Sequence, residues 1–202
     1  MKQNEIDKFI AHCNKYLDQD LESILHTPIH LIPHIDVLLY KPTEKYPYWK
    51  LITMGASDYQ MPNVPNTLGY RNEYIIFISS EGEMTDPNVI NWYCNQLFEI
   101  AYYPVNTKSH ITYGHSIEWG NDENSDMVSA FIEMPQIIED VNFLKCKLGL
   151  LKHTIILQPI FLTRDETNTL LKIGPQAYSD YLYPENNDTK HFICERYRTE
   201  LF

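Results

Sequence analysis

The segment NEYIIFIS, residues 72–79, constrains the fold most strongly, because four apolar side chains follow one another in it. Successive side chains of a β-strand point to opposite faces of a sheet. The run Ile75, Ile76, Phe77 and Ile78 is therefore apolar on both faces. Strands of this kind lie where both faces of a sheet are covered. We therefore expect residues 72–79 to form a central strand.

Further stretches have the alternation or the β-branched and aromatic composition of strands. They are HIDVLLY at 34–40, YWKLITM at 48–54, HITYGHSIEW at 110–119, MVSAFIEM at 127–134 and KHTIILQPIFL at 152–162. The turn-forming sequence KPTEKYP joins the first two of these stretches. That arrangement predicts an antiparallel hairpin with a loop of medium length.

The N-terminal residues 1–27 are expected to be helical. Apolar side chains recur there mostly at steps of three and four, which is typical of one face of an amphipathic helix. They are Ile6, Phe9, Ile10, Cys13, Leu17, Leu21 and Ile24. A second helix should begin at a cap provided by Thr85 or Asp86, and we expect Pro104 to end it.

Thr163 and Glu166 have the spacing of a capping box, and Gly174 is suited to the end of the helix that follows. Residues 175–182 indicate another short helix. Helices and strands do not alternate regularly, which favours an α+β fold with a mixed, largely antiparallel sheet flanked by helices. No repeat or linker divides the chain, so residues 1–202 are expected to form a single domain.

The formal net charge is −11, from 27 acidic and 16 basic residues. Proteins that bind nucleic acids need a positive surface against the phosphates, so this balance disfavours a nucleic-acid partner. Two interpretations of the acidity stay open. It can serve solubility alone, or it can steer a basic partner protein toward the chain.

The four cysteines lie far apart and include no C-x-x-C pair, which disfavours a zinc cluster or a disulfide framework. The N-terminal sequence MKQNEIDKFIAHCNKYL is mixed in charge and has no apolar signal-peptide core. No apolar run approaches the length that spans a membrane. We therefore expect a cytoplasmic protein with reduced thiols and no membrane partner.

One histidine–aspartate pair could perform chemistry. His34 and Asp36 are two residues apart on a predicted strand, so their side chains should point to the same face. A metal ion could use them with His110 or His115 as a further ligand. A metal-dependent or hydrolytic enzyme around His34, Asp36 and His115 is one alternative function, and a regulatory scaffold is another. For the pair itself, a hydrogen bond at a strand start is the simpler interpretation.

A second histidine pattern fails on local geometry. His26, His30 and His34 repeat every four residues, but Pro28 and Pro33 interrupt the helix that would align them. Other catalytic signals are also missing. The sequence around Ser57 lacks the G-x-S-x-G pattern of a nucleophile elbow, and no glycine fingerprint for a phosphate or dinucleotide cofactor occurs. We therefore expect neither a cofactor nor a catalytic residue.

Several motifs together resemble the bacterial branch of the Suppressor of fused family. They are HIDVLLYKPTEKYPYWKLITMGAS with the following MP, NEYIIFI, a helix that ends in AYYP, YGHSI, and LQPIFLTRDE. The resemblance covers roughly residues 30–180. It departs from the family in residues 118–150 and at the variable ends. Each motif is weak, but their order and spacing are fairly specific.

The resemblance implies a binding protein without catalytic residues. Eukaryotic relatives sequester a transcription factor, and bacterial relatives are inferred to be immunity proteins that neutralise polymorphic toxins. The recurring positions of the family correspond here to Thr53, Gly55, Ser57, Glu73, Pro159, Thr163, Glu166 and Gly174. We expect these residues to shape the backbone, since glycine and turn residues usually do so.

The partner-binding surface is predicted to use five residues of the hairpin and the turn after it. They are Tyr46, Tyr48, Trp49, Asp58 and Tyr59. Large aromatic side chains are enriched at binding hot spots, and acidic side chains steer basic partners. The expected partner is a basic toxin domain bound in a stoichiometric complex.

Overall fold

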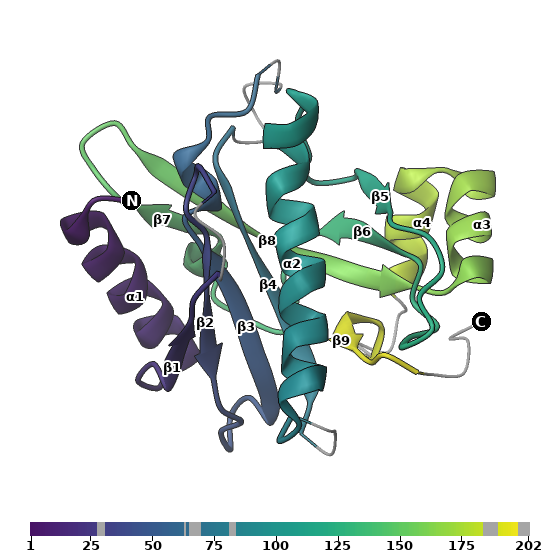
Figure 1. Cartoon of the computed structure of the whole chain (residues 1–202), viewed down its shortest axis with the longest axis horizontal. Coiled ribbons are helices and arrows are strands. Elements are labelled where there is room, and N and C mark those ends of the chain that lie inside the picture. The colour runs from purple at the N-terminus through teal and green to yellow at the C-terminus, as the bar shows by residue number, and fades with distance from the viewer. Residues whose placement is uncertain (28–30, 63, 65–69, 81–83, 184–189, 198–202) are drawn as a thin grey trace.

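The computed structural model describes residues 1–27, 31–62, 64, 70–80, 84–183 and 190–197. Within them, one sheet has the strand order β1-β2-β3-β4-β8-β6-β5, with β7 beside β8 and β9 beside β4 (Figure 1). The strands are β1 Ser23–Leu25, β2 Asp36–Tyr40, β3 Tyr48–Met54, β4 Asn72–Ser79, β5 Ser116–Glu118, β6 Ser129–Glu133, β7 Lys145–Lys147, β8 His153–Leu162 and β9 Ile193–Cys194. Only β4–β8 and β4–β9 are parallel among the described pairs. The predicted α+β fold with a mixed, largely antiparallel sheet is confirmed.

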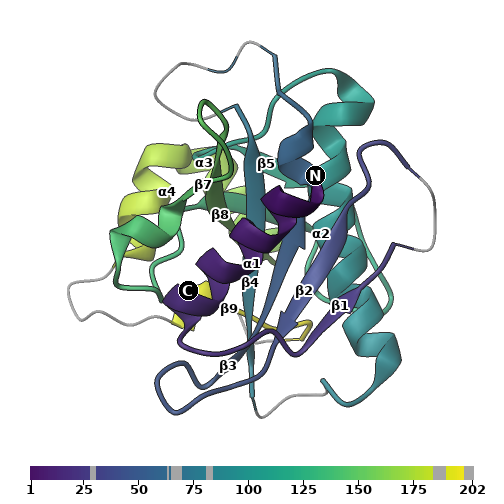
Figure 2. The same ribbon diagram turned by 90° about the vertical axis from the view of Figure 1, so that its left-hand side faces the viewer.

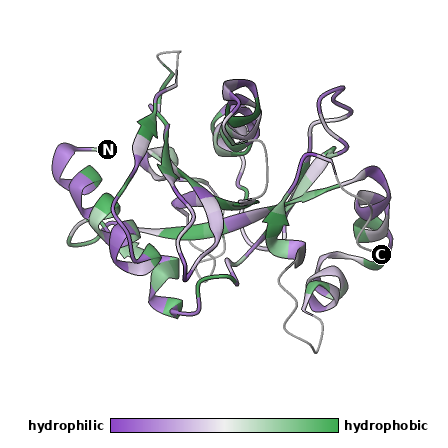
Figure 3. Cartoon of the chain, turned by 90° about the horizontal axis from the view of Figure 1, so that it is seen from below, coloured by the Kyte–Doolittle hydropathy of each residue, from purple (hydrophilic) through white to green (hydrophobic). Residues whose placement is uncertain are grey.

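The helices cover both faces of this sheet. They are α1 Gln3–Leu17, α2 Pro87–Thr107, α3 Arg164–Ile173 and α4 Pro175–Leu182, with short 3₁₀ turns at Ala56–Asp58, Val141–Leu144 and Lys190–Phe192. Helix α2 packs on one face, and α1, α3 and α4 pack on the other (Figure 3). Figure 2 shows α1 and α2 on opposite sides of the strands.

Strand β4 lies in the middle of the sheet, as its apolar run predicts. Tyr74, Ile76 and Ile78 belong to the core cluster under α2. Ile75 and Phe77 belong to the cluster under α1. Each face is covered, so all five side chains are buried and the strand needs no polar face.

The N-terminal helix is shorter than predicted. Helix α1 ends at Leu17, because Asp18 takes a left-handed conformation with φ 55° and ψ 43°. Ile24, which the helical spacing assigned to this helix, lies instead in the edge strand β1. The prediction of one helix through residues 1–27 was therefore wrong. Apolar spacing alone could not distinguish a continued helix from a turn and a short strand.

Helix α2 begins as predicted and ends later than predicted. The Asp86 side chain accepts a hydrogen bond from the Asn88 amide at 2.8 Å, and Pro87 occupies the first turn. Pro104 does not end the helix, which continues to Thr107. Proline removes one backbone donor, but the Pro104 ring is buried and its carbonyl still accepts from Ser109 at 3.2 Å. Packing therefore outweighs the local preference.

The C-terminal helices follow the sequence prediction. Helix α3 starts with the reciprocal capping box of Thr163 and Glu166 and ends at Gly174, where φ is 85°. Helix α4 covers residues 175–182 as expected. Among the described residues, no helix combines the length and the apolar character needed to cross a lipid bilayer.

Candidate functional site

Three of the predicted motif residues surround the buried carboxylate of a fourth, Glu73. Glu73 is fully buried, and it accepts hydrogen bonds from the Thr53 hydroxyl at 2.7 Å and the Gly55 amide at 2.9 Å. The amides of Ala56 and Ser57 also donate to it, at 3.2 and 3.0 Å. Burial raises the pKa of Glu73, and these hydrogen bonds oppose the rise. The arrangement anchors the turn after β3 and offers no access to a ligand.

Gly55 brings this turn against the segment before β2. Its φ of 118° lies in the region that favours glycine. A Cβ at this position would overlap the carbonyl oxygen of His34 and lie 3.3 Å from the Ile35 Cα. Glycine at position 55 therefore allows the turn after β3 to pack directly against the backbone of His34 and Ile35.

The remaining motif residues lie in β8 and α3. Pro159 sits opposite Ile132 in the β6–β8 pairing. Thr163 and Glu166 exchange hydrogen bonds at the start of α3, and Gly174 joins α3 to α4. These residues therefore serve strand pairing, the capping of α3 and the junction between α3 and α4.

The structure does not bring the five predicted contact residues into one surface. Tyr46 is buried in the core beside α1. Tyr48 packs toward that core, whereas Trp49 packs toward the core under α2, so their side chains lie on opposite faces of β3. Asp58 and Tyr59 are half-buried in the turn after β3. A single partner face cannot include both Tyr48 and Trp49.

Asp58 is engaged within the chain. Its carboxylate pairs with Lys152 at 2.8 Å, and Lys152 also pairs with Glu5 at 2.9 Å. Burial alone would raise the pKa of Asp58, but hydrogen bonds from Lys152 and from the terminal amine of Met1 outweigh it and hold the pKa below its usual value. This cluster ties α1 to the β3 turn and to β8.

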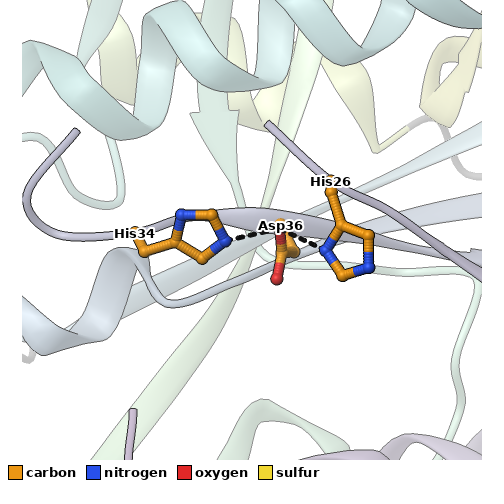
Figure 4. A group of neighbouring side chains, drawn as sticks. All are labelled: His26, His34 and Asp36. Atoms are coloured by element: carbon orange, nitrogen blue, oxygen red, sulfur yellow. Dashed lines mark hydrogen bonds and ion pairs between the residues drawn. The ribbon is translucent and has the colours of Figure 1, made fainter. Parts of the chain in front are cut away.

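The predicted His34–Asp36 pair is formed, and a different histidine completes it. His34 Nε2 lies 3.0 Å from Asp36 Oδ1, and His26 Nδ1 lies 3.1 Å from the same oxygen (Figure 4). Among the described residues, this is the group whose ligand atoms lie close enough to hold a metal ion, all within 4.8 Å of one another. The rings of His110 and His115 meet edge to face, with 5.0 Å between ring centroids, and do not belong to the group.

The strand register explains why His26 reaches Asp36. In the β1–β2 pairing, Ser23 lies opposite Leu39 and Leu25 lies opposite Val37. One further step places His26 opposite Asp36. The contact between His26 and Asp36 was not predicted from the sequence, because residues 23–25 were expected to be helical and form β1 instead. His30, the middle histidine of the four-residue repeat, lies outside the described residues.

A groove runs along α2, and we call it the α2 groove. It is lined by α2 residues between Asn95 and Asn106, by residues 117–119 and 121–124, and by Thr27 and Leu31. Its volume is about 1030 Å³. Residues of helix α2 and of strand β5, both labelled in Figure 1, belong to this lining. No local sequence pattern predicts this groove, because its walls come from segments far apart in the chain.

The α2 groove is acidic. Its described lining includes Glu99, Glu118, Asp122 and Glu123 and contains no lysine, arginine or histidine. Glu118 pairs with Arg164 outside the lining, and both side chains are exposed. Burial would raise the pKa of Asp122, but hydrogen bonds from Asn124 and Trp92 dominate and keep it below the usual value.

Hydrogen bonds hold several side chains in and beside the groove walls. Gln96 is only 7% exposed, and its side-chain oxygen accepts no hydrogen bond from the described residues. The Trp92 indole donates to Asp122 at 2.6 Å, and the Trp119 indole donates to Met127 at 3.1 Å. The Tyr102 hydroxyl donates to the Pro33 carbonyl at 3.0 Å. These bonds hold the side chains around the groove, whereas the Gln96 oxygen is itself buried beneath its lining.

Comparison with known families agrees with the motif order. The family described as Suppressor of fused protein (SUFU) matches residues 32–192. Among curated proteins, no significant match is found.

Solved structures share the fold at low sequence identity. A SUFU homologue from Neisseria gonorrhoeae FA 1090 has a TM-score of 0.67 at 12% identity, covering 96% of this chain and 94% of that chain. A chain of the Sufu–Fu complex has a TM-score of 0.68 at 14% identity, covering 97% and 91%. Drosophila Suppressor of Fused has a TM-score of 0.63 at 14% identity, and the match covers 94% of this chain and 49% of that one.

Proposed function

Because the chain belongs to the Suppressor of fused family, we propose that it is a non-enzymatic protein that captures a protein partner in its α2 groove. The observation that carries this proposal is a preformed groove with four carboxylates and no basic side chain in its described lining. A structurally similar chain is described in a Sufu–Fu complex, which supports binding as the role of the fold.

The chemistry of the groove favours a basic segment of the partner. Glu99 and Glu123 are exposed, and no ion pair joins either of them to a described residue. Arginine side chains pair with carboxylates through two parallel hydrogen bonds and stack on aromatic rings. Tyr103 and Trp119 provide such rings in the lining.

We propose further that the partner is a basic toxin domain and that the complex forms in the cytoplasm. The resemblance to bacterial relatives implies this role, and the net charge of −11 suits rapid association with a basic domain. Capture would be stoichiometric, since one groove covers one surface of one partner.

Charge reversal tests where the partner binds. The variant Glu99→Lys with Glu123→Lys should bind the C-terminal domain encoded by the gene immediately upstream about tenfold more weakly, mainly through slower association. Glu44→Lys with Glu139→Lys is the matched control, because both residues are exposed, lie outside the groove lining and give the same change in net charge. Equal weakening by the two pairs would refute docking in the groove.

Growth rescue tests the biological role. Coexpression of the wild-type chain should restore growth to cells that produce the upstream domain, and neutralisation in vitro should saturate at one chain per toxin. Neutralisation by far smaller amounts would contradict capture and indicate catalysis. Absence of both binding and rescue would refute the toxin as the partner.

A further inference from the structure

Two imidazoles and one carboxylate converge where β1 ends and β2 begins. Figure 4 shows one nitrogen of His26 and one of His34 turned toward Asp36. Asp36 is 7% exposed, and these two imidazoles are the basic side chains that lie within 3.1 Å of its carboxylate in the part of the chain that the structure describes. A nitrogen that faces a carboxylate oxygen at 3.0 or 3.1 Å carries a hydrogen in the metal-free state.

We propose that His26, His34 and Asp36 bind a divalent transition-metal ion of the zinc class. Zinc lies about 2.0–2.2 Å from imidazole nitrogen and carboxylate oxygen, so tetrahedral ligand atoms are roughly 3.3 Å apart. The two nitrogen–oxygen distances of 3.0 and 3.1 Å need little widening. The histidine side chains are 69% and 49% exposed, so their rings can turn to bring the two nitrogens together.

The backbone already holds the ligands in place. His26 continues the β1–β2 register to a position opposite Asp36, and His34, two residues before Asp36, places its Nε2 3.0 Å from the same carboxylate. The close approach of Gly55 fixes the backbone at His34. Binding needs no deprotonation of a neutral imidazole, because its hydrogen can move to the outer ring nitrogen. Three protein ligands leave one tetrahedral position for water or for a group from a partner.

The ligand types define the class of ion. Imidazole nitrogens suit zinc, copper, nickel and cobalt, whereas calcium and magnesium prefer oxygen ligands alone. A bound ion would tie the end of β1 to the start of β2, next to Thr27 in the lining of the α2 groove. The metal site does not depend on the proposed function.

Metal titration of the untagged, chelator-treated chain tests the proposal. Calorimetry with Zn²⁺ and visible absorption with Co²⁺ should each show one site per chain, and Mg²⁺ should not compete. His26→Ala and His34→Ala should each weaken Zn²⁺ binding at least about tenfold. His110→Ala is the matched control, because it removes one histidine of the neighbouring ring pair and should leave the affinity unchanged.

Circular dichroism verifies that each variant is folded. Both histidine side chains are exposed, so neither substitution should disturb the core. Nuclear magnetic resonance should show that Zn²⁺ shifts the ring signals of His26 and His34. Unchanged affinity in both single variants would overturn the proposal. So would loss of binding in His110→Ala alone. An absence of Zn²⁺ binding by the wild type would leave the group as a hydrogen-bonded trio and also refute the site.

Discussion

Substitution of Gly55 by alanine should lower the free energy of unfolding. The loss should be larger than for a glycine that also has a positive φ but has open space where the Cβ would lie. The left-handed backbone costs a non-glycine residue about 1–2 kcal/mol. At Gly55 the new Cβ also overlaps the His34 carbonyl oxygen and approaches the Ile35 Cα at 3.3 Å. These neighbours are backbone atoms, so they cannot rotate away. Overpacking of this kind costs about 1–3 kcal/mol more.

Gly120→Ala is the matched control for the backbone term. Gly120 has a φ of 90°, and an added Cβ would meet no described atom within 4 Å. Its loss of stability should therefore stay at about 1–2 kcal/mol. Gly55→Ala should lose about 2–5 kcal/mol, the sum of the two terms.

Urea denaturation followed by circular dichroism measures both free energies of unfolding. For a domain of this size, each kcal/mol corresponds to a shift of about 2–4 °C in Tm. If the two variants lose the same stability, the close approach of residue 55 to the His34 carbonyl contributes nothing. The reasoning that links the β3 turn to the His34 segment would then fail.

Two further predictions concern buried and paired charges. Glu73→Gln should lower the free energy of unfolding by about 1–3 kcal/mol in urea denaturation, because at least one buried donor loses its acceptor; Glu44→Gln, an exposed control, should not. Burial raises the pKa of Asp58 and of Glu5, but hydrogen bonds lower both pKa values by more. The pKa of Asp58 therefore lies below its ordinary value of 3.8, and that of Glu5 lies below its ordinary value of 4.5. Their pairing with Lys152 should therefore add stability above about pH 4.5, and this stability is lost as the pH falls through the lowered pKa values. The variant Lys152→Met should flatten the acid side of a curve of unfolding free energy against pH. An unchanged slope would contradict the pairing.

Local sequence rules were sufficient for the central strand and for the start of α3. The apolar run of 72–79 predicts a central strand because no arrangement other than burial on both faces suits it. The capping box at Thr163 places the start of α3 because its hydrogen bonds span only three residues. The motif order likewise indicated the family that the match over residues 32–192 confirms.

Tertiary structure decided everything that depends on two distant segments. Strand β1 has three residues, all only partly buried, so no local pattern identifies it, and His26 meets Asp36 through its register. Pro104 stays inside α2 because long-range burial outweighs a local preference. The α2 groove joins carboxylates from α2 and from residues 117–124. Contacts between such distant segments arise from tertiary packing. The local spacing of residues along the chain does not predict them.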